Sequence, residues 1–242
     1  MKKKSGPLYF RIKEDIKERI EKSEFTKGQI IPTEKELCEH YHACRVTIRR
    51  ALDELISEEI LERGFGKSAT VKCEPVPRTM NSLSGLYEEL EKTGIKCSSF
   101  ILSSTVIPAD KEIAEKMKLQ ISDEVIRIER LRYASGVPLC FQELYLNHQL
   151  CPGMQLKNGE FSLYKTLDKE YGVKVQVADQ TIKAAMSDYR MSAMLELPSQ
   201  TCMLLVSRTA YDSGGECVEY SHTYYVSNRY QLDMTLKREE QN

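Results

Sequence analysis

A cluster of basic residues between positions 40 and 52 carries the clearest chemistry in this sequence. The segment holds three arginines, two histidines and no acid. On a helix, Arg45 and Arg49 lie one turn apart and project to the same side. A planar guanidinium offers two parallel N–H donors that match O6 and N7 of a guanine. The spacing favours a helix that reads bases in the major groove of DNA; the alternative is a solvated charged helix face.

Two further arginines lie two residues apart in an apolar segment. In a strand, Arg130 and Arg132 share one face with Ile126 and Ile128. Guanidinium groups among apolar neighbours are poorly placed for water but well placed for a buried anion. The segment therefore predicts an anion site, and the alternative is an ion pair with acids on a neighbouring strand.

Several polar residues could complete such a site. The hydroxyls of Ser162 and Tyr164 are two residues apart and could form a phosphate cradle, unless Ser162 only caps a helix. Ser84 and Gly85 precede a helical stretch whose first N–H groups could bind an anion. Glu219 could accept hydrogen bonds from sugar hydroxyls, or it could be an exposed strand acid.

A third cluster, with possible zinc ligands, consists of Cys38, His40, His42 and Cys44. Its spacing fits no common zinc site, because alternate residues of a helix point in different directions. We therefore expect no metal site and no cofactor.

The elements around the first cluster are predicted by periodicity and capping. Leu8, Ile12 and Ile16 recur every fourth residue, as in an amphipathic helix. Thr33 and Glu36 match a capping box, so a second helix begins near Thr33 and runs to about residue 41. A third helix begins near residue 44. Two short strands follow over 59–63 and 68–72, joined by a turn over 64–67. Three helices and a hairpin describe a winged helix-turn-helix.

The second half of the chain contains an internal repeat. Residues 130–136 are echoed by residues 208–214, 78 residues later in the sequence. Each copy follows a short predicted helix and turns at Ser-Gly into a second strand. Two such units imply an antiparallel sheet with helices against it, an α+β domain. The expected helices span 110–118 and 188–197, and the expected hairpins pair 125–133 with 138–146 and 203–211 with 217–226.

Composition limits the class of protein. Of the 242 residues, 41% are apolar and 29% charged, and the net charge is −1, which excludes a disordered chain, a collagen and a membrane protein. No apolar stretch suits a secretory signal, so we expect a cytoplasmic protein whose eight cysteines are reduced thiols. Residues 1–72 carry a net charge of +3, the sign expected for a nucleic-acid module. With two prolines, residues 73–79 predict a linker between domains at 1–72 and 80–242.

The first 72 residues resemble the DNA-binding domain of GntR-type bacterial transcription regulators. The matching segments are residues 7–9, 32–37, 45–52 and 64–67. The resemblance implies a set of DNA-binding residues, with Gly66 letting the wing approach the minor groove: Thr33, Lys35, Arg45, Thr47, Arg49, Gly66 and Lys67. Cys44 departs from the serine of the family pattern, which weakens the cap of the third helix by about 1 kcal/mol.

The remaining chain resembles the UTRA effector-binding domain of the HutC subgroup, which has a chorismate-lyase-like fold. The resemblance lies in residues 130–132 and 161–164, and in Glu219 six residues before Tyr225. It implies a homodimer that binds a small metabolite, often a sugar phosphate. The implied effector-binding residues are Ser84, Gly85, Arg130, Arg132, Gln142, Ser162, Tyr164, Glu219 and Tyr225. Gln142 stands where many relatives carry Glu, and residues 226–228 depart from the family's Arg-x-Asp, so no particular sugar is named.

These patterns together predict a metabolite-responsive, DNA-binding transcription regulator rather than an enzyme. We expect a homodimeric repressor that a small anionic effector releases from a near-palindromic operator in double-stranded DNA. One alternative is a constitutive DNA-binding protein whose second domain only dimerises. The other is a chorismate-lyase-like enzyme.

Overall fold

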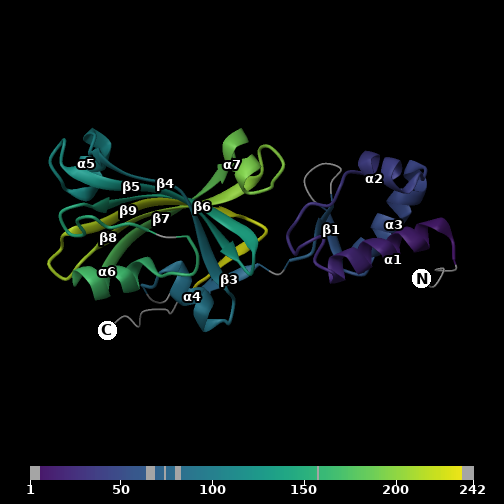
Figure 1. Ribbon diagram of the computed structural model, residues 1–242, viewed down its shortest axis with the longest axis horizontal. Coiled ribbons are helices and arrows are strands. Elements are labelled where there is room, and N and C mark those ends of the chain that lie inside the picture. Colours follow the sequence, from purple (N-terminus) through teal and green to yellow (C-terminus); the bar gives the residue numbers. More distant parts are fainter. Residues whose placement is uncertain (1–5, 64–68, 74, 80–82, 157, 236–242) are drawn as a thin grey trace, which may run out of the picture. The chain divides into compact units, whose positions relative to one another are not determined.

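The computed structural model of the chain describes residues 6–63, 69–73, 75–79, 83–156 and 158–235 (Figure 1). The chain divides into two compact units, with the boundary between residues 74 and 75. No helix within the described ranges is both long enough and apolar enough to cross a lipid bilayer.

The first unit consists of three helices and a short antiparallel hairpin. Its elements are α1 (Leu8–Glu21), α2 (Glu34–Tyr41), α3 (Arg45–Ser57), β1 (Leu61–Arg63) and β2 (Ala69–Val71). The buried face of α1, with Ile12 and Ile16, packs in one core with Leu37 of α2 and Ile48 of α3. Lys13 of α1 is itself buried, and its ammonium is held by two carboxylates of the α3 region. These elements confirm the predicted winged helix-turn-helix.

The two helices of the turn motif begin in different ways. At α2, the Thr33 hydroxyl accepts a hydrogen bond from the Glu36 N–H at 3.4 Å, and the Glu36 carboxylate accepts one from the Thr33 N–H at 2.7 Å. At α3, Cys44 is the N-cap residue and makes no side-chain cap hydrogen bond. The predicted capping box is confirmed, and so is the start of α3 beside Cys44.

The second unit is built on a six-stranded antiparallel sheet. Its strands are β4 (Cys97–Pro108), β5 (Glu124–Ala134), β6 (Val137–Asn147), β7 (Val177–Met186), β8 (Cys202–Tyr211) and β9 (Cys217–Val226). Its helices are α4 (Leu86–Lys92), α5 (Lys111–Met117), α6 (Leu163–Tyr171) and α7 (Tyr189–Met194). The strand order is β4-β5-β6-β9-β8-β7, so two related strand–helix–hairpin units meet at β6 and β9. The predicted repeat is thus a structural repeat.

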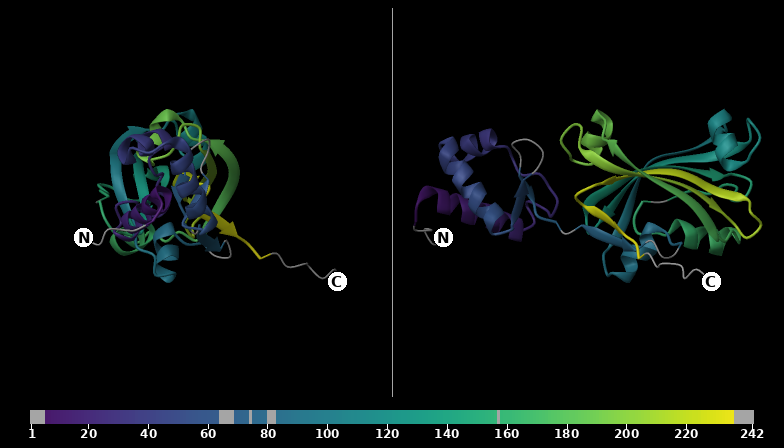
Figure 2. Two further views of the ribbon diagram at one scale, coloured as in Figure 1. Left: turned by 90° about the vertical axis from the view of Figure 1, so that its right-hand side faces the viewer. Right: turned by 180° about the vertical axis from the view of Figure 1, so that it is seen from behind.

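The helices lie on the two faces of this sheet. In Figure 1 and in the right-hand view of Figure 2, α4 and α6 lie on one side, and α5 and α7 lie on the other. Ile126 and Ile128 of β5 share a buried cluster with Leu163 and Leu167 at α6. The even-numbered residues of β5 therefore face α6, which places Arg130 and Arg132 on that inner face.

Two parts of the second unit differ from the sequence-based expectation. Residues 76–79, expected in a linker, form β3 (Val76–Thr79), which pairs in parallel with β10 (Tyr230–Asp233). Pro77 is tolerated because β3 is paired on one side only, so the missing N–H breaks no ladder. Helix α7 ends at Met194 rather than near Leu197, because Glu196 adopts a left-handed backbone conformation with φ 56°, and Leu197 directly before Pro198 disfavours helical geometry.

Candidate functional site

Helix α3 presents two arginines to solvent from a firmly packed base. Ile48 and Leu55 are fully buried against the core of the first unit. Outside this buried face, the side chains of Arg45 and Arg49 are 62% and 59% exposed. A helix fixed by one face and carrying cations on the other is suited to lie in a groove of DNA.

Both arginines contact one carboxylate from the preceding helix. Nε of Arg49 donates a hydrogen bond to Oε1 of Glu34 at 3.2 Å, and Nε of Arg45 lies 3.5 Å from Oε2 of the same residue. The Glu34 side chain is only 12% exposed. Sequence reasoning missed this residue, because the pairing spans 11 and 15 positions across the turn between α2 and α3.

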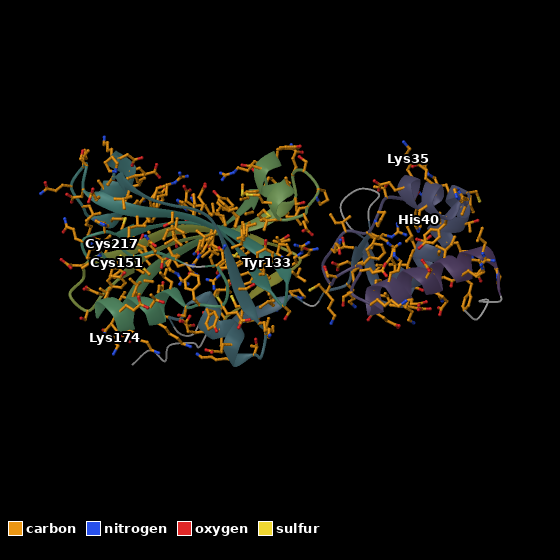
Figure 3. All side chains as sticks on the ribbon, in the orientation of Figure 1. Lys35, His40, Tyr133, Cys151, Lys174 and Cys217 are labelled. Atoms are coloured by element: carbon orange, nitrogen blue, oxygen red, sulfur yellow. The ribbon has the colours of Figure 1, made fainter. Side chains whose placement is uncertain are left out.

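The other residues predicted to bind DNA surround this helix. Thr33 is exposed at the start of α2, and its hydroxyl is used in the capping box. Lys35 is exposed on α2 and extends away from the core (Figure 3). The Thr47 hydroxyl lies 3.1 Å from the Cys44 sulfur, and this hydrogen bond lowers the pKa of the Cys44 thiol. Gly66 and Lys67 lie outside the described residues.

One further residue of α3 has the chemistry of a base contact. Val46 follows Arg45 and is 77% exposed, although it is apolar. An exposed methyl group on such a helix can contact the C5 methyl of thymine. The signal in the sequence was its position on the arginine side of α3, where an apolar residue is unexpected.

The possible zinc ligands do not form a site. Within the described ranges, no group of three or more His, Cys, Asp or Glu side chains could hold a metal ion. Cys38, His40, His42 and Cys44 are spread along α2 and the turn after it.

The second unit contains a cavity between the sheet and the starts of α4 and α6. It is lined by Gly85, Leu86, Tyr87, Glu88, Arg130, Arg132, Gln142, Leu163, Tyr164, Val206, Arg208, Glu219, Ser221, Thr223 and Tyr225. The fold thus brings together most of the predicted effector-binding residues: Gly85, Arg130, Arg132, Gln142, Tyr164, Glu219 and Tyr225.

Arg130 and Arg132 are buried in this cavity with unused hydrogen-bond donors. Their exposed fractions are 2% and 5%. Arg130 donates from Nε to Oε1 of Gln142 at 2.8 Å, and Arg132 donates from Nη2 to the sulfur of Cys97 at 3.1 Å. Among the described residues, Nη1 of Arg130 and Nε of Arg132 have no hydrogen-bond partner. Burial and the like charge of Arg132 lower the pKa of Arg130, so the cavity favours an incoming anion.

Neutral and acidic groups line the cavity beside the arginines. Nε2 of Gln142 donates to the Thr223 hydroxyl at 3.0 Å, which links β6 to β9. Glu219 is 2% exposed, so the alternative of an exposed strand acid is wrong. The Glu219 carboxylate and Thr223 hydroxyl are suited to the hydroxyl groups of a polar ligand.

Ser84 and Ser162 lie outside the cavity lining, unlike the expectation for both. The Ser162 hydroxyl accepts a hydrogen bond from the Lys165 N–H and donates one to Glu88, so it caps α6. The Ser84 hydroxyl donates to Glu89 at 2.7 Å. Both hydroxyls thus make hydrogen bonds within or beside the helix starts. For Ser162, this is the helix-capping alternative that the sequence had left open. The Glu88 carboxylate also lies against Gly85, so an acid borders the helix start that was expected to bind an anion.

Arg208 is a cavity residue that the sequence-based site omitted. It donates from Nη2 to Oε1 of Gln180 at 2.8 Å and from Nη1 to the Tyr164 hydroxyl at 3.3 Å. The signal was present, because Arg208 is the counterpart of Arg130 in the internal repeat. Burial raises the pKa of Tyr164, which keeps its hydroxyl neutral beside this guanidinium.

Comparison with known proteins accounts for both units. The family model for bacterial regulatory proteins of the gntR family matches residues 8–71, and the UTRA domain model matches residues 92–231. The chain is 30% identical over 227 residues to the uncharacterized HTH-type transcriptional regulator YurK of Bacillus subtilis (strain 168), covering 93% of each protein. It is also 30% identical over 234 residues to the mannosyl-D-glycerate transport/metabolism system repressor MngR of Escherichia coli (strain K12), covering 96% of this chain and 97% of that protein.

Solved structures agree on the fold. The crystal structure of PhnF from Mycobacterium smegmatis matches with a TM-score of 0.65 at 22% identity, covering 94% of this chain and 100% of that one. This likeness confirms the predicted α+β fold class. The chain therefore belongs to the GntR family of bacterial transcription regulators, as a member that joins a helix-turn-helix domain to a UTRA domain.

Proposed function

We propose that this chain is a homodimeric repressor that a small anionic metabolite, such as a sugar phosphate, releases from a near-palindromic operator. One observation carries the ligand class. Arg130 and Arg132 are buried beside a cavity, and each retains an unused N–H donor there.

The charge in the cavity explains why an anion is favoured. A buried cation without an opposite charge is costly, because it loses its hydration and gains no full replacement. Arg130 and Arg132 donate hydrogen bonds to an amide oxygen and a sulfur, neither of which is a carboxylate. The buried acid Glu219 acts on Arg130 through its charge, but burial and Arg132 outweigh it. A phosphate or carboxylate supplies oxygens for both unused donors in charge-assisted hydrogen bonds.

The rest of the cavity supports a polyhydroxylated ligand. Glu219 is a buried acceptor, and Ser221 and Thr223 add hydroxyl groups on β9. MngR, a relative of this chain, is named as the repressor of a mannosyl-D-glycerate system. In a sugar that carries an anionic group, the anion would bind Arg130 and Arg132, and the hydroxyl groups would bind Glu219, Ser221 and Thr223.

The DNA-binding half of the proposal depends on twofold symmetry. Two copies of α3, related by a dimer axis, would read the two halves of a near-palindromic operator. Ligand binding and operator binding would be coupled by typically about 1–3 kcal/mol, or roughly 5- to 150-fold in operator affinity. Sedimentation equilibrium of the full chain tests the dimer.

A thermal-shift experiment on the full chain tests the ligand class. The panel pairs phosphorylated hexoses and amino sugars with their unphosphorylated parents, and adds carboxylate metabolites. A ligand at 100 times its Kd stabilises the folded state by about 2.7 kcal/mol, or roughly 5–10 °C in Tm. We expect a shift with phosphorylated members only, and release of operator DNA by the same compound. Recovery of the compound unchanged would distinguish a sensor from an enzyme.

Two arginine variants of β5 make the test specific. Arg132→Ala should abolish the shift and the release of DNA, because it removes an unused donor from the cavity. Arg127→Ala is the matched control, since Arg127 lies on the same strand and pairs with Glu143 on the other face of the sheet. If Arg132→Ala kept the full ligand shift, the anion site would be wrong.

A further inference from the structure

Glu34 occupies an unusual position for an acid in a DNA-binding unit. It is the first residue of α2, and its side chain lies between the exposed guanidinium groups of Arg45 and Arg49. Its carboxylate is largely buried, and Oε2 has no hydrogen-bond partner in the described part of the chain. The carboxylate thus contacts both cations from the first turn of α2.

The contacts of Glu34 orient both arginines in the same way. Each guanidinium faces the carboxylate with Nε, its innermost nitrogen. No hydrogen bond among the described residues uses a terminal Nη atom of Arg45 or Arg49. These Nη atoms form the parallel donor pair that matches O6 and N7 of guanine. Glu34 thus fixes the inner edge of each arginine and leaves the base-reading edge available.

The same carboxylate weakens the binding of DNA of any sequence. Arg45 and Arg49 are like charges one helical turn apart, and Glu34 offsets their mutual repulsion in the unbound chain. Close to a phosphate backbone, however, a negative charge weakens the sequence-independent attraction. The carboxylate therefore opposes binding everywhere, whereas its orienting effect helps only where guanines meet the arginines.

We propose that Glu34 is a specificity-determining positioning residue of the DNA-binding unit. It raises the ratio of operator affinity to non-specific affinity by orienting Arg45 and Arg49 and by repelling phosphates. This inference rests on the proposed base-reading role of the two arginines.

The test compares two charge-matched variants of α2 on two kinds of DNA. Glu34→Gln removes the charge and keeps the size of the side chain. Glu39→Gln makes the same charge change at an exposed position about 140° around the helix. The operator probe is a duplex that the wild-type chain selects from a randomised library, and the other probe is an unrelated duplex of equal length. Fluorescence anisotropy gives both affinities at several salt concentrations.

For Glu34→Gln we expect operator affinity to fall roughly tenfold or more, the loss of one well-oriented arginine contact. Affinity for the unrelated duplex should rise, because a negative charge near the phosphates is removed. The ratio of operator affinity to non-specific affinity therefore falls, since its numerator decreases and its denominator increases. Glu39→Gln should change both affinities in the same direction and leave the ratio unchanged. Circular dichroism melts of both variants establish that they are folded.

The outcomes separate this inference from the function on which it rests. If Glu34→Gln keeps the wild-type ratio, or weakens binding to both duplexes alike, Glu34 has no part in specificity. Arg45→Ala, measured in parallel, tests the base-reading role itself. If Arg45→Ala still binds the selected duplex like the wild type, the proposed DNA contact is wrong. If it loses that binding while Glu34→Gln keeps the ratio, only the inference about Glu34 fails.

Discussion

Two pairs of arginines in this protein have the same chemistry and opposite surroundings. Arg45 and Arg49 are exposed on a helix and share one carboxylate. Arg130 and Arg132 are buried on a strand and are hydrogen-bonded to an amide and a thiol. Both pairs are positively charged, but the first is accessible to a polymer and the second only to a molecule small enough to enter a cavity.

The difference teaches that burial, rather than residue type, decides what each pair needs. Water solvates the exposed pair, so the first unit folds without DNA at little electrostatic cost. The buried pair has exchanged water for an amide oxygen and a sulfur, and that exchange opposes folding. Ligand binding in the second unit should therefore be tied to stability, whereas DNA binding in the first should not.

The largest expected effect is the loss of operator binding when an exposed arginine is removed. Arg45→Ala should weaken binding by about 1–3 kcal/mol per half-site, and by about twice that for a symmetric dimer. The thermal unfolding and the ligand response of the second unit should stay unchanged. Footprinting on the selected duplex measures the loss, and a protected operator in the variant would contradict the assignment of the recognition helix.

The next largest expected effect concerns the buried pair, whose charge lowers the stability of the folded chain when no ligand is bound. Arg130→Met replaces a buried cation by an apolar chain of similar length. Without ligand, we expect the free energy of unfolding of the second unit to rise by about 1–3 kcal/mol, because a buried guanidinium whose desolvation outweighs the opposing charge of Glu219 leaves the interior. Urea unfolding followed by tyrosine fluorescence measures this change.

Arg45→Met is the matched control for that experiment. An exposed arginine replaced by methionine should change stability by no more than about 0.5 kcal/mol. A lower free energy of unfolding in Arg130→Met would show that Arg130 stabilises the fold, which would contradict its proposed role as part of a ligand site.

Local patterns in the sequence predicted most of the fold. The capping box at Thr33 sets the start of α2, and the alternation through Ile126, Ile128 and Arg130 sets the inner face of β5. Such signals depend on neighbours within a few residues, so the sequence shows them directly. The strand at residues 76–79 was missed because its partner, β10, lies more than 150 residues away.

The candidate site was predictable where strand alternation determines it and less so elsewhere. Arg130, Arg132 and Gln142 line the cavity because their strands can expose them to one face only. Ser162 was ambiguous, since a hydroxyl before a helix serves equally as a cap or as a ligand contact. The contact of Glu34 with two arginines depends on the crossing of α2 and α3, which no local pattern contains.

A smaller effect concerns the helix that carries the exposed pair. Cys44→Ser should stabilise the first unit by about 0.5–1 kcal/mol, because a serine hydroxyl at the N-cap accepts a hydrogen bond from the start of α3 where the thiol makes none. Thr33→Ala, at the other cap of the motif, should destabilise the unit by a similar amount. Thermal melts of the two variants measure both effects, and an unchanged Tm in Cys44→Ser would mean that the thiol already caps α3.

The smallest expected effect concerns His222, a half-buried group whose hydrogen-bond partners are neutral. His222 accepts or donates hydrogen bonds with Ser207 and Tyr220, both at 2.9 Å. Burial lowers the pKa of His222, although the nearby acids Glu143 and Glu112 oppose this shift. A neutral imidazole is thus the favoured form at this half-buried position, in contrast to the two guanidinium groups on the other face of the sheet.

This shift gives the stability of the second unit a definite pH dependence. The unfolded chain binds a proton at His222 near its ordinary pKa of about 6.5, and the folded chain does so only at lower pH. The stabilisation is therefore complete above pH 6.5 and is lost as the pH falls toward the folded-state pKa. In His222→Gln, unfolding free energies measured between about pH 5 and pH 7.5 should vary less with pH than in the wild type. An equal slope in the two proteins would mean that other groups set the acid sensitivity, and that burial alone does not select the charge state at this position.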